Sequence, residues 1–177
     1  TVKVDNNRSS LLGVADTAII GGGVVGCAVA RRLSLAGISV VLLEKASDIL
    51  DGASKGNSAI LHTGFDAPEG SLELACIRSG YREYLEIRES LNLPLLKTGA
   101  LVAAWIPEEE ERFPEILEKA RNNGIDDLRQ LSRQEILVME PDISENIRAA
   151  IAVPSEFVID PWSAPLAYLF QAVANGG

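Results

Sequence analysis

The sequence predicts an α/β fold, because a strand, a glycine-rich turn, a helix and a second strand follow one another within residues 16–44. Residues 17–20 form a short apolar run with two isoleucines, which is typical of a strand buried on both faces of a parallel sheet. Residues 39–43 form a second such run, and the helical segment between them stops at Gly37, a residue suited to a left-handed cap. Two strands joined through a helix in this way pair in parallel.

The turn between the first strand and the helix has the spacing of a phosphate-binding loop. Its glycines are Gly21, Gly22, Gly23 and Gly26. In the G-x-G-x-x-G pattern the first glycine turns the chain, the second lets a pyrophosphate approach the backbone, and the third lets helix and strand pack closely. The amides of Val24, Val25 and Gly26 lie at the helix start, where free N–H groups and the helix dipole favour an anion.

An acidic residue completes this pattern. The second strand ends in Glu44, 18 residues after Gly26, and an acid near this spacing bonds a ribose hydroxyl and disfavours a 2′-phosphate. Glycine clusters of this kind also arise by chance, and an acid at a strand end is often only solvated. Because strand, helix and acid are all in place here, we predict a Rossmann-like unit that binds a dinucleotide.

Composition excludes several classes of protein. The chain has 177 residues, 47% of them hydrophobic, which suffices for one domain or one and a part. A net charge of −9 without a basic cluster argues against nucleic acid as a partner. Cys27 and Cys76 fit neither a disulfide scaffold nor a metal site, so we expect two small core residues and a reducing, cytoplasmic setting. Residues 1–15 read as a polar N-terminal arm, and no run is apolar and long enough for a transmembrane segment.

The loop after Glu44 carries a resemblance to a known family. Residues 52–58 have the order G-x-S-x-x-N-S, and an apolar run with His62 follows before Gly64. This order resembles flavoprotein oxidoreductases of the D-amino-acid oxidase type, especially the branch that contains the L-2-hydroxyglutarate and flavin-linked glycerol-3-phosphate dehydrogenases. The resemblance extends over residues 17–177. One departure is Ala59, which stands where that branch commonly has glycine.

The resemblance implies FAD as the cofactor. It places the ADP half of FAD at the glycine turn and Glu44, with Lys45 near the adenosine. It places the inner part of FAD at Ser54, Asn57 and Ser58. An NAD-dependent dehydrogenase is the alternative that the glycine turn leaves open, but a simple NAD fold does not need the second Gly-Ser-Asn loop.

His62 is the only histidine, and two interpretations apply to it. A single histidine among apolar residues is often a hydrogen-bonded structural residue. The resemblance instead implies that His62 lies beside the flavin, where a neutral imidazole accepts the proton of a substrate hydroxyl while hydride leaves the adjacent carbon. The implied substrate is a small 2-hydroxy acid or glycerol 3-phosphate. The resemblance also implies a separate electron acceptor and is compatible with peripheral membrane contact. An amine oxidase of the same type is a further alternative.

The middle of the chain is predicted to contain two helices and a strand. Leu74, Ile77, Tyr81 and Tyr84 form one stripe of a helix within residues 71–91. Residues 95–105 are expected to form a strand with Gly99 as a bulge. Residues 107–124 are expected to form a helix that Pro114 kinks or restarts; its glutamates lack histidine partners, so no metal site is predicted.

The last third is predicted to contain a short helix, two strands and a final helix. Ser132 and Glu135 form a capping-box pattern, and residues 149–153 and 157–159 read as strands. Asp160 and Pro161 are expected to cap and begin the final helix. Its expected buried face consists of Trp162, Leu166, Leu169, Phe170 and Val173.

These segments predict an FAD-binding portion at residues 16–92 and the start of a second, α+β substrate domain at residues 93–160. Residues 161–177 would return to the first portion. A doubly wound sheet needs more strands than this chain supplies, so we expect an N-terminal portion of a flavoenzyme that binds FAD weakly or not at all alone. A folded but inert nucleotide-binding fragment is the remaining alternative.

Overall fold

The computed structural model describes residues 14–177, so that most of the expected polar arm lies outside the described residues. The chain divides into two compact units. The first combines the chain up to Asn57 with Pro161–Gly177, and the second is Ser58–Asp160. This boundary groups residues 58–92 with the following segment by packing, whereas their expected part in binding FAD stays a prediction.

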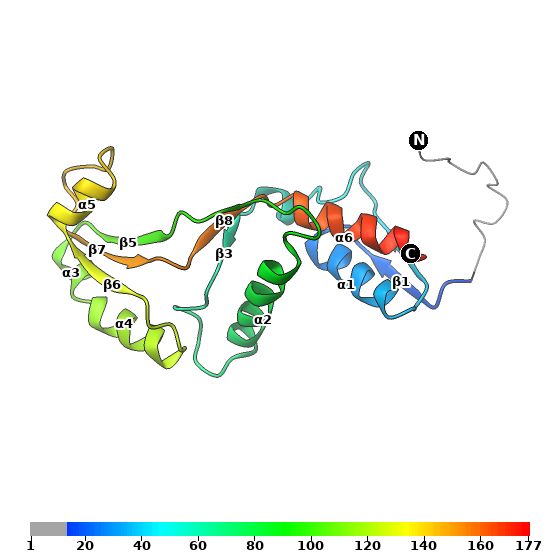
Figure 1. The fold of residues 1–177 in the computed structure, drawn as a ribbon, viewed down its shortest axis with the longest axis horizontal. Helices are drawn as coiled ribbons and strands as arrows, with labels where there is room; N and C mark the ends of the chain where they lie inside the picture. The colour runs from blue at the N-terminus through cyan, green and yellow to red at the C-terminus, as the bar shows by residue number, and fades with distance from the viewer. Residues whose placement is uncertain (1–13) are drawn as a thin grey trace. The chain divides into compact units, whose positions relative to one another are not determined.

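The first unit is a parallel β-α-β arrangement with an added helix (Figure 1). Its elements are β1 (Thr17–Ile20), α1 (Val24–Leu35), β2 (Val40–Leu43), a 3-10 turn at Ala53–Gly56 and α6 (Ser163–Ala174). β1 and β2 pair in parallel, with Thr17 opposite Val40 and Ile20 opposite Leu43. The predicted strand order and direction are therefore confirmed.

The sheet of the first unit is covered on one face only. Ala30 of α1, Val40 of β2 and Ala172 of α6 form the buried core on that face. Side chains of the opposite face are exposed, with Ile20 of β1 at 88%. The expectation that β1 is buried on both faces is wrong, because no described element covers this side of the sheet.

Helix α6 packs on α1 through small residues (Figure 1). Ala164, Pro165 and Ala172 are its buried positions. Arg31 of α1 crosses to α6, where its Nε donates to Gln171 Oε1 at 2.6 Å and its guanidinium lies 5.2 Å from the ring centre of Tyr168. Small side chains at the contact let the two helix backbones approach closely.

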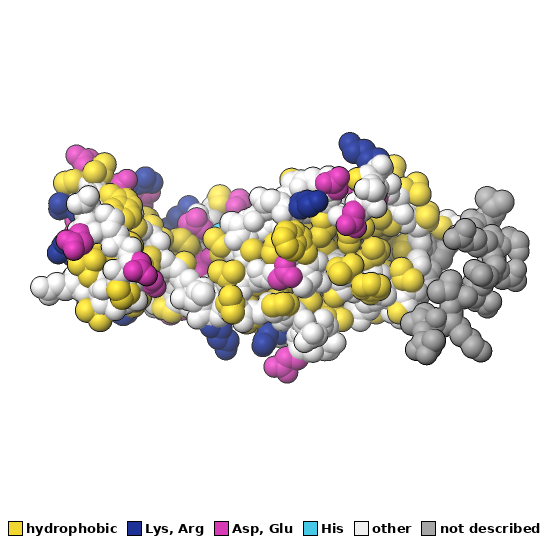
Figure 2. Space-filling model, turned by 90° about the horizontal axis from the view of Figure 1, so that it is seen from above, with side chains coloured by type: hydrophobic (Ala, Val, Ile, Leu, Met, Phe, Trp, Pro, Cys, Tyr) yellow, Lys and Arg dark blue, Asp and Glu magenta, His cyan; other side chains and the backbone are white. Residues whose placement is uncertain are grey.

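Two predictions about α6 are wrong. The helix begins at Ser163 with Trp162 as its N-cap, two residues later than the expected start at Pro161. Four of the five expected core residues are exposed: Trp162, Leu166, Phe170 and Val173. The large residues are displaced from the contact because the small ones occupy it. Figure 2 shows hydrophobic side chains gathered over the half of the molecule that contains α1 and α6.

The second unit contains two antiparallel sheets of three strands each. One has the order β3 (Ile60–Leu61), β8 (Phe157–Ile159), β4 (Leu95–Leu96), and the other β5 (Ala100–Ala104), β7 (Ala149–Val153), β6 (Arg129–Ser132). Its helices are α2 (Leu72–Ile87), α3 (Pro107–Glu110), α4 (Phe113–Asn122) and α5 (Arg133–Met139).

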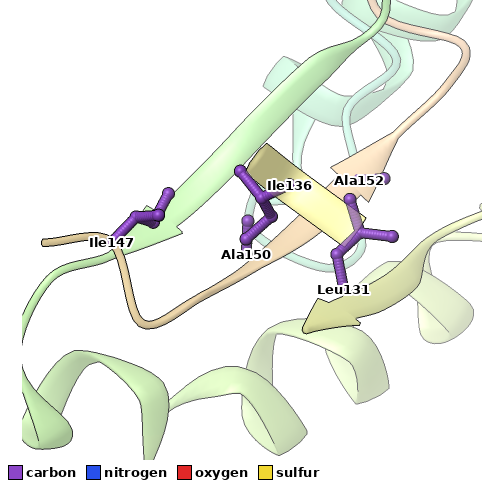
Figure 3. Close-up of a cluster of buried hydrophobic side chains, with 5 residues drawn as sticks. All are labelled: Leu131, Ile136, Ile147, Ala150 and Ala152. Atoms are coloured by element: carbon purple, nitrogen blue, oxygen red, sulfur yellow. The ribbon is translucent and has the colours of Figure 1, made fainter. Parts of the chain in front are cut away.

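Strand β7 is the centre of the second unit, because all five of its residues are buried. Ala150 and Ala152 pack with Ile136 of α5 on one face (Figure 3). Ala149 and Ile151 pack with Phe113 of α4 on the other. Successive side chains of a strand point to opposite faces, so this small-residue strand serves two cores.

Glycine and proline explain where the predicted elements divide. The expected strand at 95–105 is two strands in different sheets, since Gly99 turns the chain with φ +68. The expected helix at 107–124 is α3 and α4, and Pro114 lies in the first turn of α4, so the predicted restart is confirmed. Gly124 has φ +66 just after α4.

Helix α2 and the capping box of α5 match their predictions. Ser71 Oγ accepts from Leu74 N at 3.1 Å, and Leu74 and Tyr84 are buried. Ser132 and Glu135 cap each other at the start of α5. The two cysteines differ from each other, because Cys27 is buried whereas Cys76 is exposed, contrary to the expected core position.

Gly80 lies inside α2, and a Cβ at this position would meet nothing within 4 Å. We expect Gly80→Ala to raise the free energy of unfolding by about 1 kcal/mol, because alanine loses less backbone entropy in a helix. Urea unfolding measures the change as a higher midpoint. Gly64→Ala is the opposite control, since Gly64 has φ +88 and its Cβ would lie 2.9 Å from Leu74 Cδ1. An unchanged midpoint for Gly80→Ala would contradict this account.

Candidate cofactor site and histidine

The glycine turn brings the start of α1 against the end of β1. Gly21 has φ +105, and its amide donates to the carbonyl of Leu43 at 2.8 Å. A Cβ on Gly26 would lie 2.0 Å from the carbonyl oxygen of Gly21. No side chain fits in that space, so this backbone geometry requires glycine at position 26. The first turn of α1 is thereby held next to the strand end.

The start of α1 has amides available for an anion. Gly23 is the N-cap and provides no side-chain acceptor. Val24, Val25 and Gly26 form the first helical turn, where no preceding carbonyl lies within the helix to accept their N–H groups. Of the three, the Val24 amide donates to a side chain of the second loop. The N–H groups and the helix dipole together attract a phosphate. This is the arrangement that the glycine spacing predicts.

The second loop returns to this helix start. Ser54 Oγ accepts a hydrogen bond from Val24 N at 3.1 Å, and a Cβ on Gly23 would lie 3.2 Å from the same oxygen. The side chain of Asn57 is exposed and donates to the carbonyl of Ser54 at 2.8 Å. The sequence predicted that this loop returns toward the nucleotide, and within the first unit the loop does reach the glycine turn.

Glu44 also lies at the turn. Its Oε2 accepts from Gly22 N at 2.6 Å and its Oε1 accepts from Ala46 N at 2.9 Å. The Ala46 amide, followed by the Gly22 amide, lowers the pKa of Glu44 below its ordinary value, and neighbouring Lys45 adds to the effect. A carboxylate is therefore maintained at the end of β2, beside the expected position of the ribose.

Glu44 contributes a pH-dependent part of the stability. Because its pKa is lower in the folded chain, the contribution is present above the ordinary glutamate pKa of about 4.3 and is lost as pH falls through the lowered value. We expect wild type to exceed Glu44→Gln in stability at pH 7, with the difference vanishing on acidification. Urea unfolding at several pH values measures it. Glu118→Gln, at an exposed site in α4, controls for loss of one charge.

His62 lies in the second unit, directly after β3. Its side chain is 49% exposed, and its Nδ1 lies 3.2 Å from Oε2 of Glu156. Glu156 is only 3% exposed, and its Oε1 accepts from Thr63 N at 2.7 Å and from Thr63 Oγ1 at 2.9 Å. The imidazole therefore has one nitrogen against a buried carboxylate, and almost half of its surface is open.

The sequence did not reveal Glu156 as a site residue. β3 and β8 are antiparallel, with Ile60 opposite Val158 and Leu61 opposite Phe157. Continuing this register by one residue places Glu156 opposite His62. The two residues are 94 positions apart, and their pairing depends on strand alignment rather than on a local pattern.

The remaining predicted site residues divide between the two units. Lys45 is exposed next to Glu44 in the first unit. Ser58 belongs to the second unit, as does His62. Ala59 lies between them with φ +58, a left-handed conformation that disfavours side chains. A glycine at this position would adopt the same conformation without that cost. Within residues 14–177, no group of three or more histidine, cysteine or acidic residues is placed to bind a metal ion.

Comparison with known proteins identifies the family. Residues 16–177 match the family described as FAD dependent oxidoreductase, of the D-amino-acid oxidase (DAO) type. The chain belongs to this family. It is 37% identical over 161 residues to a glycerol 3-phosphate dehydrogenase of Caloramator mitchellensis. It is 34% identical over 128 residues to the mitochondrial L-2-hydroxyglutarate dehydrogenase of Caenorhabditis elegans.

Solved structures of the DAO family share the fold. The FAD-bound, dithionite-reduced L-α-glycerophosphate oxidase of Mycoplasma pneumoniae aligns over 93% of this chain with a TM-score of 0.83 and 28% identity. Glycine oxidase of Bacillus cereus aligns over 92% with a TM-score of 0.81 and 27% identity. The predicted α/β fold is therefore confirmed.

The matches extend over most of this chain but only part of each relative. They cover 91% and 71% of this chain and 34% and 30% of the two dehydrogenases, and the aligned regions are 44% and 45% of the two oxidase structures. Among the described residues, no helix has the length and apolar character that crossing a bilayer requires.

Proposed function

We propose that this chain binds FAD through its first unit and carries a proton-accepting histidine in its second unit. The observation that carries the proposal is the Gly21–Gly26 contact, together with the Glu44 carboxylate at the same turn. The contact holds the start of α1 against the end of β1, so that the amides of the first helical turn are presented at the strand end, and the carboxylate suits a ribose hydroxyl. Family membership supports FAD over NAD.

The residues present fit the ADP half of FAD. The amides of Val25 and Gly26 would bind the pyrophosphate, and that of Val24 would join them by exchanging its bond with Ser54 Oγ. Glu44 would exchange its bond with Gly22 N for a ribose hydroxyl. Ser54 and Asn57 reach the same turn. Lys45 and Ser58 complete the proposed set. Bound flavin would supply the redox chemistry by accepting hydride from the substrate carbon.

We propose a small hydroxy substrate, either a 2-hydroxy acid or glycerol 3-phosphate, with His62 accepting the hydroxyl proton. The support is the names of the similar proteins, glycerol 3-phosphate dehydrogenase and L-2-hydroxyglutarate dehydrogenase. His62 has the exposure that proton transfer to a substrate requires. A cytoplasmic setting, peripheral membrane contact and a separate electron acceptor belong to the same proposal.

A nucleotide titration tests the cofactor assignment. FAD added to the 177-residue chain is expected to bind weakly, with its fluorescence change reversed by ADP, since the first unit contacts the ADP half. NADP should displace less than ADP, because Glu44 repels a 2′-phosphate. Displacement by NAD that is stronger than by ADP would favour an NAD-dependent dehydrogenase instead. Absence of binding by every nucleotide would indicate an inert fragment.

A second candidate is oxidation of an amine. The structural match to glycine oxidase, at 27% identity and a TM-score of 0.81, favours it. Reduction of the visible flavin band separates the two candidates. At a saturating concentration of FAD, the protein-bound flavin should be reduced by glycerol 3-phosphate or L-2-hydroxyglutarate and not by glycine. Reduction by glycine alone would establish the amine-oxidising alternative.

A further inference from the structure

We propose that Glu156 is a positioning residue that fixes the tautomer of His62. In this arrangement the neutral imidazole keeps its proton on Nδ1, and the Nδ1–H group donates a hydrogen bond to Glu156. Nε2 then carries the lone pair. The inference deepens the proposed function, on which the catalytic role of His62 rests. The tautomer itself can be tested without any turnover.

The geometry specifies which nitrogen faces the carboxylate. His62 Nδ1 lies 3.2 Å from Glu156 Oε2. A carboxylate offers only acceptors, so a proton on Nδ1 makes a hydrogen bond, whereas a lone pair there would face another lone pair. The carboxylate therefore favours the Nδ1–H form. Nε2 is then the only ring nitrogen that can accept a proton from a substrate.

Glu156 is itself held in a single orientation. Its second oxygen accepts from both the amide and the hydroxyl of Thr63. The side chain is 3% exposed, and its three contacts offset the cost of burying a charge. A carboxylate fixed on one side by Thr63 cannot rotate away from His62 on the other.

The turn before Glu156 is anchored as well. Ser155 accepts from Tyr81 of α2 through its carbonyl at 2.8 Å and bonds Asp127 through its hydroxyl. Phe157, the next residue, packs against the ring of Tyr81 with 6.1 Å between ring centres. These contacts fix the backbone on both sides of Glu156. The acid is thus presented to His62 by the fold and not by a flexible side chain alone.

A nitrogen-15 NMR experiment tests the tautomer directly. His62 is the only histidine, so a histidine-labelled chain gives the signals of a single imidazole. At a pH where the ring is neutral, wild type should show a protonated Nδ1 and an unprotonated Nε2. Glu156→Gln keeps the shape but can present its NH2 group, and its spectrum should shift toward the Nε2–H form. A wild-type Nε2–H ring, or a Glu156→Gln spectrum identical to wild type, would overturn the proposal.

Thr63→Val is the matched control. It removes the hydroxyl bond to Glu156 while leaving the contact between Glu156 and His62. If Glu156 acts through the tautomer, Thr63→Val should retain the Nδ1–H signal. If both variants change the spectrum equally, Glu156 merely holds the local fold and the positioning role is wrong.

The rate of flavin reduction separates this inference from the proposed function. At a saturating concentration of FAD, Glu156→Gln should lower the rate of flavin reduction at least tenfold with little change in KM, because Glu156 is proposed to act through His62 and not on the substrate. Glu156→Asp should recover part of the rate. If His62→Asn leaves the rate unchanged, the proposed role of His62 fails while the tautomer assignment stands on the NMR result. If Glu156→Gln has a wild-type rate although His62→Asn does not, Glu156 has no positioning role in the reaction.

Discussion

Gly26→Ala is expected to abolish saturable FAD binding. The added Cβ would lie 2.0 Å from the carbonyl oxygen of Gly21, and both partners are backbone atoms that cannot rotate away. The start of α1 must therefore move off the turn and take the amides of the first helical turn with it. We expect a loss of stability of roughly 3 kcal/mol or more. Flavin fluorescence and urea unfolding measure the two effects.

Gly80→Ala provides the comparison for this substitution. It also adds one methyl group to a glycine, but Gly80 lies in α2, outside the proposed FAD site, and its Cβ would meet nothing within 4 Å. It should retain FAD binding without a loss of stability. Gly26→Ala protein that binds FAD as wild type does would show that the phosphate is bound elsewhere, and the proposed site would be wrong.

His62→Asn is expected to lower the rate of flavin reduction by about 10²–10⁴-fold, the range over which general acid–base groups contribute. Asparagine can occupy the same space but is not a base near neutral pH. FAD binding should not change, because the first unit provides the proposed ADP contacts. Stopped-flow reduction of the FAD-loaded protein by glycerol 3-phosphate measures the rate.

His62→Ala with added imidazole sharpens this test. The side chain is 49% exposed, so a free imidazole could reach the space that the truncation opens. Partial recovery of the rate with imidazole is expected for a missing base. If His62→Asn instead has the rate of wild type, His62 is a hydrogen-bonded structural residue, which is the other interpretation given for a single histidine among apolar residues.

The part of the site that could be predicted from the sequence is local. Gly26, Glu44 and Ser54 lie on three consecutive segments, so their spacing already encodes a strand, a turn and a return loop. Glu156 could not be found in this way, because its bond to Thr63 spans 93 positions and depends on the register between β3 and β8. A shift of that register by one residue would place an aromatic or a hydroxyl opposite His62.

The fold shows the same division between local and long-range information. The predictions of a capping box at Ser132 and of a left-handed glycine after α1 are confirmed, because each feature depends on neighbours within one turn. The buried face of α6 was predicted wrongly. Its large residues form a helical stripe, but the buried positions are Ala164, Pro165 and Ala172, and Ala172 packs in the cluster that contains Ala30 of α1. Periodicity indicates that a helix has an apolar face and does not indicate which face its partner needs.

The first unit is assembled from two segments that are distant along the chain, so that its completion depends on what happens to the chain between them. The bond from Arg31 to Gln171 spans 140 residues, a separation whose closure costs chain entropy. The second unit is continuous, and within it the amide of Ile159 donates to the carbonyl of Ala59 at 2.8 Å. Folding of the second unit therefore joins the two points at which the chain leaves and re-enters the first. Once these two points are joined, the effective chain separation between α1 and α6 is a few dozen residues, so the entropy cost of closing the contact between them is smaller.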